Sequence, residues 1–179
     1  MGSGPTPSQT VGPFFSFALP FQGGHEVAAP AAPGAVRVEG QVLDGAGEPV
    51  PDALVEIWQA GPEGRYPSAD SQFTGFGRCG TDAEGLFRFV TVKPGATPAP
   101  EGRAQAPHLN VTIFARGLLR HLVTRMYFPD EGEANSIDPV LNLVRDPVAR
   151  STLVAREEGG VLRFDIHLQG AGETVFFAI

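Results

Sequence analysis

Val36-Arg37-Val38-Glu39-Gly40-Gln41-Val42-Leu43 alternates apolar and polar residues, and Asp44-Gly45-Ala46-Gly47 then interrupts the alternation. Such a period of two is typical of a β-strand with one buried face, and Asp and Gly favour a tight turn. The segments 53–59 and 86–92 have the same character. Each of these three segments is therefore predicted to be a strand.

Further strands are predicted at 108–115, 121–128, 161–168 and 173–178. About seven short strands separated by turns predict an all-β fold, a two-sheet antiparallel β-sandwich. We expect one domain over residues 1–179, in which residues 1–34 form an N-terminal arm.

Two Asp-Pro pairs, Asp138-Pro139 and Asp146-Pro147, each place an N-cap acid before a proline suited to the first helical turn. Short helices are expected to begin at both. The segments 20–34 and 94–107 are rich in Pro, Ala and Gly, and are expected to be ordered loops.

Composition limits the function classes. The formal net charge of −7 at pH 7 argues against a nucleic-acid partner. The sequence has no long apolar run and no leader-like N-terminus, which predicts a cytoplasmic protein without membrane association. Cys79 is the only cysteine, so it can form no disulfide within the chain and is expected to be a partly buried side chain.

The glycines and alternating apolar residues of 40–55 and 81–89 are similar to a widespread β-sandwich core found in transthyretin-like domains. That core is structural, because its glycines permit tight turns and its apolar residues face the opposite sheet. It favours a stand-alone binding module about as much as an enzyme.

A longer series of motifs, from Thr6 to Phe177, narrows the choice. Its members, in order, are Thr6-Pro7-Ser8-Gln9-Thr10-Val11-Gly12-Pro13-Phe14-Phe15, Val55-Glu56-Ile57-Trp58-Gln59-Ala60, Gly64-Arg65-Tyr66, Gly75-Phe76-Gly77-Arg78, Thr91-Val92-Lys93-Pro94-Gly95, Ala106-Pro107-His108, Phe114-Ala115-Arg116-Gly117, Thr124-Arg125-Met126-Tyr127-Phe128 and Arg163-Phe164-Asp165-Ile166-His167-Leu168-Gln169-Gly170-x-Gly172-Glu173-Thr174-Val175-Phe176-Phe177. The series resembles the intradiol ring-cleaving dioxygenases over nearly the whole chain.

The resemblance implies that catalytic members hold Fe³⁺ with two tyrosinates and two histidines. One family Tyr aligns with Thr97, and the family His-x-His aligns with His108 and Asn110. We call Thr97, His108 and Asn110 the vestigial site. The loop that carries the other Tyr is shortened between Tyr66 and Gly75. The resemblance therefore implies a chain that binds no metal, has no catalytic residue and is inactive in isolation.

Other conspicuous residues are given structural roles. His108 is expected to be a hydrogen-bonded structural histidine, because one imidazole gives little metal affinity. Tyr66 and Tyr127 are expected to pack as amphipathic side chains, and Trp58, on an apolar strand, is expected to lie in the core. Gln105 stands where catalytic relatives have an arginine that steadies the ring.

The resemblance also implies a partner. Fe³⁺ would be held by a homologous iron-binding β subunit in an αβ hetero-oligomer, which cleaves an aromatic acid such as 3,4-dihydroxybenzoate with O₂. The N-terminal arm would pack on that subunit, and its residues Thr10, Gly12, Pro13 and Phe14 would line the substrate cavity. The other hypotheses are the stand-alone binding module and an active homodimer with unusual ligands, for which two tyrosines and one well-placed histidine are too few.

Arg116 ends an apolar strand and precedes Gly117, a position that suits a guanidinium projecting from a sheet edge towards an anion. The resemblance associates it with the carboxylate of a benzoate-type substrate. A structural salt bridge is the alternative role.

Overall fold

The alternating segment forms β1 (Ala35–Leu43), from which the first sheet is built. On one side β1 pairs antiparallel with β4 (Leu86–Val92). On the other side it pairs parallel with β10 (Val161–Arg163) and β11 (Ile166–His167), and β9 (Arg156–Glu158) pairs with β10. These facts come from a computed structural model that describes residues 9–12, 14–71 and 73–178.

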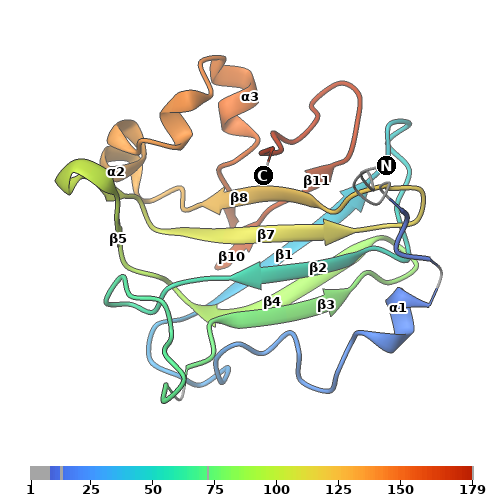
Figure 1. Ribbon diagram of the computed structural model, residues 1–179, viewed down its shortest axis with the longest axis horizontal. Helices are drawn as coiled ribbons and strands as arrows, with labels where there is room; N and C mark the ends of the chain where they lie inside the picture. The colour runs from blue at the N-terminus through green and yellow to red at the C-terminus, as the bar shows by residue number, and fades with distance from the viewer. Residues whose placement is uncertain (1–8, 13, 72, 179) are drawn as a thin grey trace, which may run out of the picture.

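The second sheet has the order β3 (Phe76–Gly80), β2 (Leu54–Trp58), β7 (His108–Phe114) and β8 (Leu122–Tyr127), with every pair antiparallel. In Figure 1 it lies in front of β1 and β4. Apolar residues of both sheets fill the space between them: Val38, Val42, Val55, Ile57, Phe87, Phe89, Leu109, Val111, Ile113 and Met126. The predicted all-β sandwich is confirmed, with parallel pairs added in the first sheet.

The C-terminal strands differ from the prediction. The expected strand 161–168 is divided, because Asp165 leaves the ladder and its carboxylate accepts the N–H of Gln41 at 3.1 Å. A Cβ at Gly40 would collide with the Phe164 carbonyl, so this close approach requires glycine. The strand predicted at 173–178 was wrong, since that segment is irregular and Phe177 N–H bonds to Val123 O at 2.8 Å.

The helices are short. As predicted, α3 (Pro147–Ser151) begins after Asp146, whose carboxylate accepts the N–H of Val148 at 2.9 Å. The prediction for Asp138-Pro139 is confirmed only in part: the Asp138 carboxylate accepts the N–H groups of Val140 and Leu141, but only the 3₁₀ helix η2 (Leu141–Leu143) follows, and α2 (Gly132–Ile137) ends just before Asp138. Figure 1 shows α2 and α3 on the side of the molecule next to β8.

The segment 94–107 is more regular than a loop. It contains a small ribbon of β5 (Thr97–Pro98) and β6 (Ala104–Gln105), joined through the 3₁₀ turn η1 (Pro100–Gly102). Thr97 pairs with Gln105 in this ribbon, and β6 leads almost directly into His108 at the start of β7.

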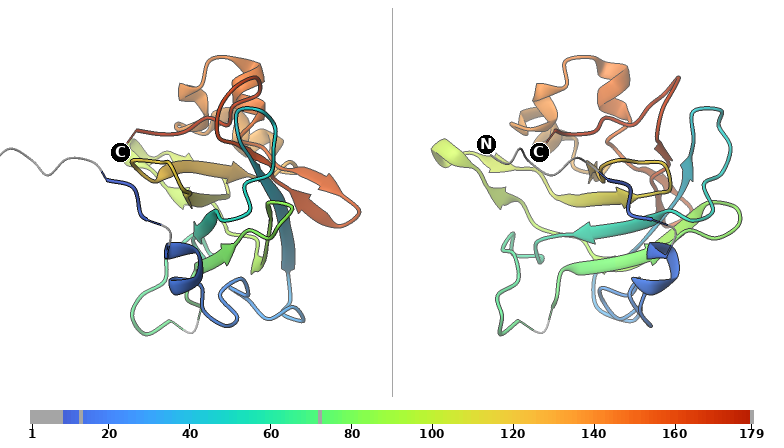
Figure 2. Two further views of the ribbon diagram at one scale, coloured as in Figure 1. Left: turned by 90° about the vertical axis from the view of Figure 1, so that its right-hand side faces the viewer. Right: turned by 45° about the vertical axis from the view of Figure 1, so that its right-hand side comes forward.

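The N-terminal segment runs along the outside of the sandwich, as the two views of Figure 2 show. It contains the short helix α1 (Phe15–Ala18). The segment 20–34 is an ordered loop, as predicted, joined to β4 by a bridge between Glu26 and Val90. None of the helices described is long and apolar enough to span a bilayer.

Candidate functional site

The second sheet turns one face away from the sandwich core, and the vestigial site lies on that face. Leu109, Val111 and Ile113 of β7 point into the core, so His108 and Asn110 point outward. Strand register places Trp58 opposite Asn110, and Asn110 opposite Arg125. Directly paired residues share a face, so these three side chains form a row across β2, β7 and β8.

Trp58 is not a core residue, and the prediction that placed it there was wrong. Its side chain is 41% exposed and stacks on Tyr66, with ring centroids 5.7 Å apart. The amide of Asn110 donates to the Tyr66 hydroxyl at 2.8 Å and to the Trp58 carbonyl at 3.1 Å. Asn110 thus joins the aromatic pair to the sheet, and Tyr66 reaches the vestigial site.

Arg125 supplies the positive charge of this face. Its Nη1 donates to Gln105 Oε1 at 2.7 Å and lies 3.5 Å from the Tyr127 hydroxyl. Gln105 is the residue opposite Thr97 in the β5–β6 ribbon, and Tyr127 is opposite His108 in the β7–β8 ladder. The guanidinium therefore contacts side chains that neighbour two positions of the vestigial site.

Asp138 provides the matching negative charge and is fully buried. Its Oδ1 accepts from the Tyr127 hydroxyl at 3.1 Å and from two backbone N–H groups, those of Val140 and Leu141. Its Oδ2 accepts the N–H of Ala106 at 2.7 Å. Burial raises the pKa of Tyr127 above its usual value, which keeps the phenol protonated as a donor. This network was not found from the sequence, where Asp138 was interpreted only as a helix cap.

His108 is structural, as predicted. It is 2% exposed, and its Nδ1 donates to the Ala106 carbonyl at 2.7 Å. Burial, together with the charge of Arg125, lowers the pKa of His108 to about 4. His108 Nε2 and Thr97 Oγ1 are buried without a hydrogen-bond partner among the residues described.

The donors of the vestigial site do not fit Fe³⁺. They comprise one imidazole, one hydroxyl and one amide, and a guanidinium lies beside them, whereas a hard ferric ion prefers anionic oxygen ligands. Across residues 9–12, 14–71 and 73–178, no three His, Cys, Asp or Glu side chains are grouped as a metal site would need.

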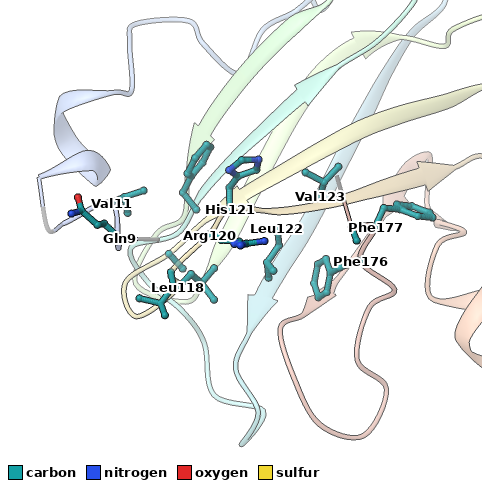
Figure 3. Close-up of a pocket in the computed structure, with 13 residues that line it drawn as sticks. Gln9, Val11, Leu118, Arg120, His121, Leu122, Val123, Phe176 and Phe177 are labelled. Atoms are coloured by element: carbon teal, nitrogen blue, oxygen red, sulfur yellow. The ribbon is translucent and has the colours of Figure 1, made fainter. Parts of the chain in front are cut away.

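A second candidate region lies at the opposite end of the β7–β8 hairpin from the vestigial site. Three segments of the chain line a cavity of about 410 Å³ there. Figure 3 shows Gln9 and Val11 of the N-terminal segment, Leu118 of the β7–β8 connection, and Phe176 and Phe177 of the C-terminal segment around it. The structure therefore brings the segment that contains Thr10 and Gly12 close to the connection that contains Arg116, although none of these three residues lines the cavity. Pro13 lies outside the described residues. Phe14 is 69% exposed.

Arg116 lies two residues after the end of β7, and its side chain is 66% exposed. Its Nε forms an ion pair with Asp52, the carboxylate of which is 22% exposed. The salt bridge that was considered as an alternative is therefore present. A guanidinium carries five N–H donors, so a contact through Nε is compatible with a second anion at the terminal nitrogens.

The fold agrees with the comparisons to known proteins. The family described as Dioxygenase matches residues 12–170, and the chain belongs to this family, which confirms the family predicted from the motifs. The chain is 47% identical to the protocatechuate 3,4-dioxygenase alpha chain of Burkholderia cepacia, over 97% of both chains. It is 41% identical to the beta chain of the same enzyme from that organism, over 78% of this chain and 66% of the relative. Among solved structures, the dioxygenase domain of a carbohydrate-binding fusion from Streptomyces sp. SirexAA-E superposes with a TM-score of 0.61 at 28% identity, covering 93% of this chain and 99% of that one.

Proposed function

We propose that this chain is the α subunit of a protocatechuate 3,4-dioxygenase and that a homologous β subunit holds the Fe³⁺ of the complex. The observation that carries the proposal is the mismatch between the vestigial site and a ferric ion, in a chain whose similarity to an alpha chain extends over its whole length. The chain is also similar to a beta chain, as expected if the two subunits share an ancestor.

In the proposed reaction, both atoms of O₂ enter between the two hydroxyl-bearing carbons of 3,4-dihydroxybenzoate, and the product is 3-carboxy-cis,cis-muconate. The iron of the β subunit supplies the ring-cleaving chemistry. This chain forms one wall of the substrate cavity, and from there it binds and orients the ring. We further propose that the complex is cytoplasmic, which is compatible with a chain that has a single cysteine.

Arg116 is proposed to bind the ring carboxylate, with Thr10, Gly12, Pro13 and Phe14 forming a wall of the same cavity. Its exposure supports this role, as does its place in the β7–β8 connection, other residues of which line a cavity together with Gln9 and Val11. Asp52 would hold the guanidinium by Nε while the terminal nitrogens face the substrate. A carboxylated ring in a largely apolar pocket needs such a cation.

Residues 1–34 are proposed to form an arm, within a single domain, that packs on the β subunit. Helix α1 and its flanks expose large apolar side chains, namely Phe14, Phe17, Leu19 and Phe21. Such surface is commonly covered in obligate complexes, which bury more than about 2,000 Å² in total. If the chain sediments as a stable monomer and does not associate with an added iron-binding β subunit, the stand-alone binding module is favoured instead.

The assignment of the iron is tested by producing the chain alone and together with an iron-binding homologue. The chain alone is expected to be colourless, inactive and free of stoichiometric iron, whereas the complex should show the visible absorption of ferric tyrosinate and cleave protocatechuate. Stoichiometric iron and a burgundy colour in the chain alone would refute the proposal.

The role of Arg116 is tested in the assembled enzyme with Arg116→Ser, and with Arg116→Lys as the charge-conserving control. A charge-assisted contact is worth roughly 1.5–3 kcal/mol, so Arg116→Ser should lower kcat/KM for protocatechuate by about ten- to hundredfold, mainly through KM. Iron content and colour should not change, and the lysine variant should lose less. Equal losses on protocatechuate and on catechol, with the complex intact, would exclude the carboxylate-binding role.

A further inference from the structure

We propose that Arg125 is a built-in cation that excludes metal ions from the vestigial site, so that the site is closed to metal by its charge as well as by its missing ligands. The proposal concerns this chain alone and does not depend on assembly with a β subunit. It follows from where the guanidinium lies, from the neutral side chains that hold it, and from the donors that one substitution would bring together.

The guanidinium lies among the residues that a metal would need. Arg125 is directly opposite Asn110 on the same face of the sheet. Its Nη1 bonds to Gln105 at 2.7 Å, and Gln105 is opposite Thr97. The same nitrogen is 3.5 Å from the hydroxyl of Tyr127, which is opposite His108. Each position of the vestigial site thus faces Arg125 itself or a residue that Arg125 contacts.

Two neutral side chains hold Arg125 in place, and no carboxylate forms an ion pair with it among the residues described. Gln105 and Tyr127 hold the guanidinium, and Tyr127 donates in turn to the fully buried carboxylate of Asp138. Asp138 already accepts three backbone N–H groups, those of Ala106, Val140 and Leu141, so its oxygens are engaged. A metal ion at the vestigial site would meet the cation of Arg125, while the nearest carboxylate serves other partners.

One substitution would bring three possible ligand side chains together at this site. His108 is in place, and the Tyr66 hydroxyl is 2.8 Å from the Asn110 amide. Asn110→His would therefore create a His-x-His pair on one strand with a phenol within reach, which is a usable set of three donors. Arg125 would remain directly opposite residue 110, and in contact with Tyr127, the residue opposite His108.

The test measures Co²⁺ binding to the full chain, in the assembly in which it purifies, by titration of the visible d–d absorption against wild type. N110H should bind Co²⁺ hardly better than wild type, whereas N110H/R125Q should bind at least about tenfold more tightly than N110H. N110H/R125K keeps the charge and should behave like N110H. Equal Co²⁺ affinity of N110H and N110H/R125Q would overturn the proposal, as would equal affinity of the lysine and glutamine variants.

A second measurement does not require a new metal site. Asn110→Asp is nearly isosteric and places a negative charge opposite Arg125. The change in thermal midpoint caused by N110D should be more favourable in the wild-type background than in the R125Q background, by roughly 2–4 °C. The same change in both backgrounds would show that the charge of Arg125 does not act on the vestigial site, and the proposal would fail.

Discussion

Arg125 and Arg116 lie on the same β7–β8 hairpin, but their guanidinium groups have different surroundings. Arg125 is held by Gln105 and Tyr127, with a fully buried carboxylate behind them. Arg116 is 66% exposed, and its ion pair is with the partly exposed Asp52. A charge that is satisfied inside the chain shapes the protein itself, whereas a charge left at the surface can serve an external anion.

The two carboxylates show the same contrast. Asp138 accepts a phenol and three backbone N–H groups, so it organises the ribbon β5–β6, strand β8 and helix η2 around one point. Asp52 lies in the turn before β2 and is paired with an exposed side chain. Stability should therefore depend on the first carboxylate, and substrate affinity on the second.

The largest expected effect is that of Asp138→Ala, which leaves three buried N–H groups and the Tyr127 hydroxyl without their acceptor. Unpaired buried groups of this kind cost about 4 kcal/mol together. Urea unfolding followed by Trp58 fluorescence measures the loss. Asp52→Ala is the matched control and should cost under about 1 kcal/mol. Similar losses of stability at the two positions would show that Asp138 is no more important to the fold than Asp52.

The next effect is a pH dependence that arises from His108. Burial lowers its pKa to about 4 in the folded chain, against an ordinary value of 6.5, in surroundings that contain Arg125, Asp138 and Tyr127. The unfolded chain therefore takes up a proton below about pH 6.5 that the folded chain does not. Keeping His108 neutral therefore costs the folded chain no stability above pH 6.5. As the pH falls from 6.5 towards 4, the free energy of unfolding decreases, by about 3 kcal/mol at most.

This linkage is measured as the difference in unfolding free energy between pH 7 and pH 4.5, in wild type and in His108→Gln. Carboxylates titrate in both proteins and cancel in the comparison. Wild type should lose about 2 kcal/mol more than the variant over this interval. His121→Gln, at the distant cavity, serves as the control for removing an imidazole elsewhere in the chain. An equal loss in wild type and His108→Gln would show that His108 is not held neutral by burial.

Sequence reasoning succeeded where structure is determined locally. The period of two in 36–43 and 86–92 matches β1 and β4, and the Asp146-Pro147 pair caps α3. These signals depend on residues that are adjacent in the chain. The family was predicted in a different way, from a series of motifs that extends over nearly the whole chain.

The failures have physical causes. Trp58 was misplaced because Leu54 and Val55, on opposite faces of β2, are both fully buried, so hydrophobicity does not reveal which face is outside. The role of Asp138 depends on contacts with Ala106 and Tyr127, which are distant in sequence. The segment 173–178 is apolar like a strand, yet its recorded backbone bonds are few and join it to different neighbours.

The smallest expected effect separates the two roles of Arg116. Asp52→Asn removes a partly exposed ion pair, and such pairs contribute about 0.2–1 kcal/mol to stability. If Asp52 orients Arg116 for the substrate, the variant should raise KM for protocatechuate a few-fold, roughly two- to fivefold, with kcat unchanged, because the guanidinium keeps its charge and loses only its fixed position. Glu158→Gln, at the exposed pair with Arg156, is the control and should change neither quantity. If Asp52→Asn instead lowers stability as much as Asp138→Ala while KM stays constant, the ion pair stabilises the fold. Arg116 would then have a structural role, as Arg125 does, and no role in substrate binding.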